Sequence, residues 1–116
     1  MIVETAKEKG PWRDGENDLI VADYFAMLKA ELSGRKVNKA EHRRHLQHLI
    51  GRAEGSIEYK HQNISAVLVG MGETWINGYK PAYNYQGSLE DAVARWMAAH
   101  QSDFVERVVS PPGTPG

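Results

Sequence analysis

The chain has 116 residues, a formal net charge of −1 and no cysteine. This length allows one domain with a single modest core, and contents of 41% hydrophobic and 25% charged residues are those of an ordinary globular protein. Without cysteine there is no disulfide, no thiolate nucleophile and no cysteine-ligated zinc. The chain also lacks an apolar run long enough to span a membrane, and its first residues, MIVETAKEKG, lack the apolar stretch of a secretory signal. We therefore expect a cytoplasmic protein without a membrane partner.

Residues 1–12 are expected to form a flexible N-terminal segment, in which Gly10 and Pro11 interrupt any early helix and Trp12 docks on the core. Apolar residues then recur three and four positions apart and predict a helix over about 16–32, which Ser33 and Gly34 end. This helix is expected to contribute most of the core. Its apolar stripe consists of Ile20, Val21, Tyr24, Phe25, Met27, Leu28 and Leu32.

A second helix is predicted to begin after Asn38, because an asparagine N-cap followed three residues later by Glu41 resembles a capping box. Gly51 closes this helix. Its buried edge is expected to consist of Leu46, Leu49 and Ile50.

A third helix is predicted over about 56–69, after a turn at 52–55. At 100° per residue, Ile57, Ile64 and Leu68 share one face, which we expect to point toward the core. The opposite, outward face is then expected to hold Tyr59, Gln62, Asn63 and Ala66.

A loop over 73–87 contains four aromatic residues and an Asn77-Gly78 pair, which can form a tight turn or a short hairpin. Ser88 is predicted to cap a fourth helix that ends near His100. Residues 103–109 are expected to add a final turn. The sequence thus predicts an all-α fold: a small domain of four helices over 13–109, with a helix-turn-helix-like core at 38–69, followed by a Pro/Gly linker or tail at 110–116.

Positive charge is concentrated in residues 35–61, which contain seven Lys/Arg and three Asp/Glu. A basic helix pair joined by a tight turn is what a helix-turn-helix DNA-binding module needs, with the second helix in the major groove. Amide side chains on that helix can pair with adenine, so the predicted base-reading residues are Tyr59, Gln62 and Asn63. The predicted contacts to the DNA backbone are Arg43, Arg44, Arg52 and Lys60. The alternative is a solvated basic helix face.

Two other groups of residues invite a functional interpretation. The aromatic loop residues, Trp75, Tyr79, Tyr83 and Tyr85, are candidates for a pocket that holds a base or a methyl group, although at least two of them are expected to pack on the core instead. The histidines recur every third residue and therefore drift around the helix, so we expect boundary packing for His42, solvent or phosphate contact for His45 and His48, and no metal site. Carboxylates are scattered singly, so we expect no catalytic residues, no enzyme activity in this fragment and no cofactor.

Three segments, 16–28, 51–72 and 76–86, resemble the N-terminal domains of bacterial proteins similar to restriction endonucleases, some of which carry an HNH-type nuclease module or a NO VEIN C-terminal-type module. The resemblance covers roughly residues 12–100. Residues 51–68 are also similar to the pattern GRSPGAVxxKLxN found ahead of HNH modules, with Ala53 in place of its serine and His61 in place of an apolar residue. The resemblance implies a target-recognition role in restriction-modification, with cleavage by a separate nuclease domain.

We therefore predict a domain that binds double-stranded DNA and senses its sequence or a base modification. The alternative is a protein–protein or interdomain docking module without nucleic-acid binding, which an exposed apolar patch at Trp75 and Tyr79 would favour. A third hypothesis, a small metal-dependent enzyme, requires His42, His45 or His61 to converge with an acid in a cleft.

Overall fold

The computed structural model describes residues 10–100, which form four α-helices in the order α2 (Asp14–Leu32), α3 (Lys39–Ile50), α4 (Glu54–Gly70) and α5 (Gly87–Ala99). No strand is present in this range, so the predicted all-α fold is confirmed and the hairpin proposed for the aromatic loop does not form. The expected final turn at 103–109 and the linker at 110–116 lie outside the described residues.

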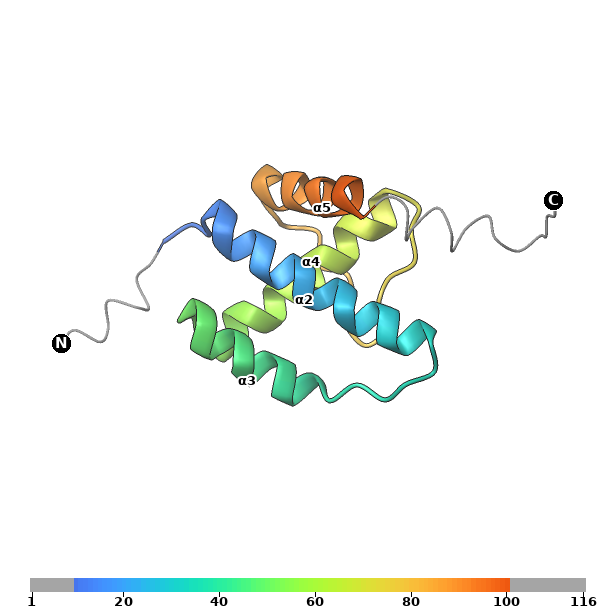
Figure 1. Cartoon of the computed structure of the whole chain (residues 1–116). Helices are drawn as coiled ribbons and strands as arrows, with labels where there is room; N and C mark the ends of the chain where they lie inside the picture. The colour runs from blue at the N-terminus through green and yellow to red at the C-terminus, as the bar shows by residue number, and fades with distance from the viewer. Residues whose placement is uncertain (1–9, 101–116) are drawn as a thin grey trace.

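The helices are arranged with α2 and α4 at the centre and with α3 and α5 on opposite sides of this pair (Figure 1). Both α3 and α5 contact α2 and α4, whereas no contact between α3 and α5 is found within the described range. The central pair is therefore shielded from both sides, which leaves α3 and α5 to supply much of the outer surface.

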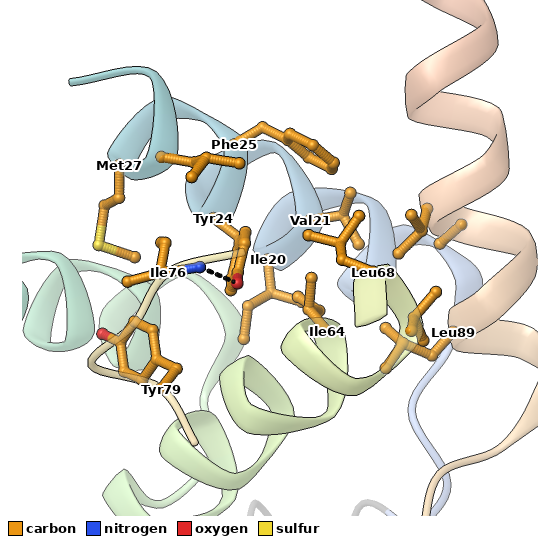
Figure 2. Packing of buried hydrophobic residues seen from close by; sticks show 14 of the residues in the cluster. Ile20, Val21, Tyr24, Phe25, Met27, Ile64, Leu68, Ile76, Tyr79 and Leu89 are labelled. Atoms are coloured by element: carbon orange, nitrogen blue, oxygen red, sulfur yellow. Dashed lines mark hydrogen bonds between the residues drawn. The ribbon is translucent and has the colours of Figure 1, made fainter. Parts of the chain in front are cut away.

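The core is centred on the inner face of α2, where Ile20, Val21 and Tyr24 are fully buried (Figure 2). The Tyr24 hydroxyl accepts a hydrogen bond from the Ile76 backbone N–H at 2.8 Å and is hydrogen-bonded to Ser65 Oγ at 2.7 Å. One buried phenol thus joins α2, α4 and the loop that follows α4. The predicted stripe of α2 is confirmed except at its last residue, Leu32, which is 49% exposed.

The ends of α3 follow the prediction. Asn38 Oδ1 accepts a hydrogen bond of 3.0 Å from the Glu41 backbone N–H, and Gly51 ends the helix at a φ of 78°. A positive φ of this kind suits a residue without a Cβ atom. The predicted buried edge is wrong at Leu49, which is 51% exposed, because α3 directs Leu46 and Ile50, one turn apart, toward the core.

Helix α4 begins two residues earlier than predicted, after Ala53, which provides no side-chain cap. It is the most enclosed helix: the buried residues on it extend well beyond the predicted face. The expectation that Asn63 and Ala66 point outward is wrong, since they are 1% and 0% exposed. The cause is that α2, α3, α5 and the loop after α4 surround the helix on nearly every side.

The loop between α4 and α5 runs back along α4 (Figure 1) and inserts Ile76 and Tyr79 into the core. Helix α5 is capped at Gln86 rather than at the predicted Ser88, whose Oγ instead accepts a 3.5 Å hydrogen bond from Asn17 Nδ2. At its far end, Trp96 is stacked between two rings, each with a centroid separation of 3.9 Å: those of Phe25 and His100.

Candidate nucleic-acid interface

The outward edge of α3 holds a row of exposed basic side chains. Arg44 and its neighbour His45 are exposed, as is His48 one turn after Arg44; Arg35 and Lys36 are exposed in the segment that leads into the helix. Within residues 10–100, none of these side chains has an ion-pair or hydrogen-bond partner, although Glu41 on the same helix is also exposed. We refer to these five residues as the α3 basic edge.

Arg43, predicted to contact the DNA backbone, lies beside this edge but is directed toward α4. Its Nε atom is 3.5 Å from Glu54 Oε2, and its side chain is only 25% exposed. Arg43 therefore joins α3 to the beginning of α4, and part of its charge is balanced within the domain.

Arg52, predicted to bind phosphate, is a buried structural residue. Its guanidinium donates hydrogen bonds to the carbonyl oxygens of Gly10 at 2.9 Å and Pro11 at 3.1 Å, and to Glu16 Oε1 at 2.9 Å. The side chain is 9% exposed. Three hydrogen bonds of the guanidinium thus fix the chain before α2, which leaves Arg52 poorly placed for the predicted phosphate contact.

Lys60 is enclosed in the same way. The Trp12 ring lies between two cations, with its centroid 4.8 Å from Lys60 Nζ and 4.8 Å from Arg52 Cζ. Burial lowers the pKa of the Lys60 ammonium, Arg52 lowers it further, and Glu16 opposes this shift. Lys60 is 9% exposed, so it too is poorly placed for the predicted phosphate contact. The expected docking of Trp12 on the core is confirmed.

The predicted base-reading face of α4 is occupied by the chain itself. The Asn63 side-chain amide donates a 2.7 Å hydrogen bond to the Ala82 carbonyl oxygen, and the Ala82 N–H donates to the Gln62 carbonyl oxygen at 3.1 Å. The Tyr59 hydroxyl donates to the Asn84 carbonyl oxygen at 3.4 Å. The buried amide of Asn63 therefore cannot reach a base edge in this conformation, whereas Tyr59 is 43% exposed and Gln62 is half-buried.

The four aromatic residues of the loop do not share one environment. Tyr79 is 5% exposed and stacks on His61, with the ring centroids 4.6 Å apart. Trp75 and Tyr85 are half-buried against the core, and Tyr83 is 63% exposed. The expectation that at least two of these rings pack on the core is confirmed. The arrangement does not favour the predicted aromatic pocket, because the Tyr79 ring is buried and so cannot contact a ligand.

A buried polar cluster that sequence reasoning did not assemble lies where α2, α3 and α4 meet. Asp23 Oδ1 is 2.7 Å from His42 Nδ1, and Asp23 Oδ2 is 3.5 Å from His61 Nε2. The expected boundary position of His42 is confirmed, since its side chain is 34% exposed. Across residues 10–100, no group of three or more His, Cys, Asp or Glu side chains is arranged to hold a metal ion.

Comparisons with protein-family models, curated proteins and solved structures found no match to this chain. Within the part of the chain that the structure describes, no helix combines the length and apolar character needed to cross a membrane.

Proposed function

We propose that the chain is a DNA-binding domain that contacts the phosphate backbone through the α3 basic edge. The observation that carries this proposal is the set of exposed basic side chains with no partner in the described range, formed by Arg44 and the two exposed histidines on α3 together with Arg35 and Lys36. Exposed arginine and lysine side chains on one helix and on the segment before it suit a polyanion, since each phosphate contact releases condensed counterions.

The charge on the opposite side of the domain supports the choice of α3. Arg95 on α5 is surrounded by Asp14, Asp18 and Asp91, and its guanidinium is 2.7 Å from Asp18 Oδ1. Since α5 and α3 lie on opposite sides of the central pair (Figure 1), the domain has an acidic side and a basic side. Such a charge distribution would orient the domain so that α3 faces an approaching polyanion.

In this proposal α3 makes most of the contacts to DNA. From α4, only the exposed parts of Tyr59 and Gln62 contact base edges. The binding we propose is thus mainly to the backbone, with limited sequence discrimination. The family resemblance suggests a setting in a restriction-endonuclease-like protein, in which a separate nuclease domain cuts the DNA; this setting is part of the proposal. The docking-module alternative is not favoured, because its expected patch would need an exposed Tyr79.

The decisive experiment is a fluorescence-anisotropy titration of labelled duplex DNA at several salt concentrations. We expect binding of the wild type to weaken steeply with salt, and Arg44→Ala to lower the slope of log affinity against log salt by about 0.9, the value for one lost phosphate contact. Lys36→Ala should act in the same direction. Duplexes with methylated adenine or cytosine, titrated in parallel, test whether a base modification is sensed.

Arg95→Ala is the matched control, because it changes the net charge as Arg44→Ala does but removes a cation from the acidic side. We expect it to leave both the affinity and the salt slope unchanged. The proposal is wrong if duplex DNA fails to bind at low salt, or if Arg95→Ala and Arg44→Ala weaken binding equally.

A further inference from the structure

The buried cluster of Asp23, His42 and His61 connects three helices through one carboxylate. Asp23 belongs to α2, His42 to α3 and His61 to α4, and the two imidazoles approach different oxygens of the Asp23 side chain. The Asp23 side chain is 13% exposed, so water is largely excluded from the carboxylate. The protonation state of these two imidazoles therefore affects how stably α3 packs against α2 and α4.

The two arms of the cluster are not equivalent. His42 is hydrogen-bonded to Asp23 Oδ1, whereas Oδ2 and both ring nitrogens of His61 are buried without a hydrogen-bond partner. His61 is 1% exposed. Buried polar atoms without partners are unusual in a folded protein and each is costly, which marks the His61 arm as incomplete.

A proton on His61 would complete that arm. A neutral imidazole has one N–H donor, whereas a protonated one has two donors and a positive charge. With Oδ2 at 3.5 Å, the added charge would be attracted to a carboxylate in surroundings of low dielectric constant. The face of the Tyr79 ring, stacked at 4.6 Å, also attracts a cation.

We propose that Asp23, His42 and His61 form a proton-dependent clasp: a proton gained by His61 pairs α4 with the same α2 carboxylate that holds His42 of α3, and so holds the three helices together more tightly. The clasp thus links the pH of the solution to how stably α3, which carries most of the α3 basic edge, packs against the central helices. Only this last consequence, for DNA binding, rests on the proposed function.

Other charged and titratable groups surround the clasp on every element packed against it. Arg43 on α3 and Glu58 on α4 act with opposite signs on Tyr79, whose ring stacks on His61. Lys39 pairs with Glu31 at 3.1 Å and lies 5.8 Å from the centroid of the Tyr79 ring. The phenol rings of Tyr24 and Tyr79 also lie beside His61, with centroid separations of 6.1 and 4.6 Å. None of these other groups is an imidazole. A change in stability confined to the pH range where imidazoles titrate therefore reports on the clasp and on the exposed histidines.

The test is urea unfolding of the whole chain between about pH 8 and about pH 6, the range in which imidazoles gain a proton. We expect the unfolding equilibrium constant of the wild type to fall as the pH is lowered, by up to about tenfold per pH unit for one full proton taken up on folding. Asp23→Asn removes the charge but keeps the shape, and should abolish this dependence. His48→Gln, which removes an exposed histidine, should retain it.

Nitrogen NMR of the wild-type imidazoles provides a second measurement, which needs no variant and remains decisive if Asp23→Asn does not fold. The expected result is that His61 carries a proton on both ring nitrogens in the folded protein at the lower pH. The clasp is overturned if the stability of the wild type falls or stays constant as the pH is lowered over this range, or if His61 keeps a single ring proton while the chain is folded. Neither measurement involves DNA, so failure of the clasp and failure of the proposed function are distinguishable.

Discussion

The Asn63 side-chain amide donates a 2.7 Å hydrogen bond to the Ala82 carbonyl oxygen and so ties the loop before α5 to the side of α4. The Ala82 N–H donates in turn to the Gln62 carbonyl oxygen at 3.1 Å. Both backbone groups of Ala82 are thereby satisfied by α4. The arrangement lets a loop without strands pack against a helix while its polar backbone stays hydrogen-bonded.

Asn63→Ala is expected to lower the free energy of unfolding by about 1–3 kcal/mol, because it removes a buried hydrogen bond and leaves the Ala82 carbonyl oxygen without a partner. Urea unfolding measures this loss. Gln62→Ala is the neighbouring control and should cost much less, since Gln62 holds the loop through its backbone. If Asn63→Ala keeps full stability yet loses discrimination between DNA sequences, the side chain reads bases after all.

Arg52→Ala is expected to destabilise the fold by about 3 kcal/mol, because it removes the cation paired with the largely buried Glu16 carboxylate, along with two bonds to the chain before α2. Arg44→Ala, by contrast, should change stability by less than about 0.5 kcal/mol, as expected for an exposed side chain without a partner. Thermal or urea unfolding of the two variants gives the comparison. Equal losses would show that Arg52 is not the internal anchor described above.

Tyr79 makes the domain sensitive to alkali. Burial raises the pKa of the Tyr79 phenol from 10.0 to about 12, and Asp23 and Glu58 add to the shift. Because the folded pKa lies above the unfolded one, the stabilisation is complete below about pH 10 and is lost as the pH rises toward 12, up to a total of about 3 kcal/mol. Tyr79→Phe should show a shallower loss of stability between about pH 9 and about pH 11.5, whereas Tyr83→Phe, at an exposed ring, should behave like the wild type.

Tyr24→Phe is expected to cost about 1–3 kcal/mol, because the buried Ile76 N–H and the Ser65 hydroxyl would each lose their hydrogen-bond partner without any change in ring packing. The double variant Tyr24→Phe/Ser65→Ala should lose less than the sum of the two single changes, since both remove the same interaction. Urea unfolding of the three variants measures the difference. Strict additivity would mean that the two hydroxyl groups do not interact.

The parts of the fold that sequence reasoning predicted are those set by neighbouring residues. The apolar spacing of α2 and the caps of α3 at Asn38 and Gly51 are local signals, and the structure reproduces them. Arg52 was misjudged because its partner Gly10 is 42 residues away, and Asn63 because Ala82 is 19 residues away. The sequence alone does not distinguish a basic or amide side chain that is exposed to solvent from one that is hydrogen-bonded to a carbonyl oxygen distant in the chain. The Asp23 cluster was missed for the same reason: its three members come from three helices.

The absence of contact between α3 and α5 in the described range has an energetic consequence. The Arg44 and Arg95 side chains lie on these two helices and share no partner within the described range, so a double-mutant cycle between them should yield a coupling energy near zero. The basic side and the acidic side could then be altered one at a time, by selection or by design, with each change leaving the thermodynamic contribution of the other intact. The central helices α2 and α4 thus separate two surfaces whose charges can be changed independently.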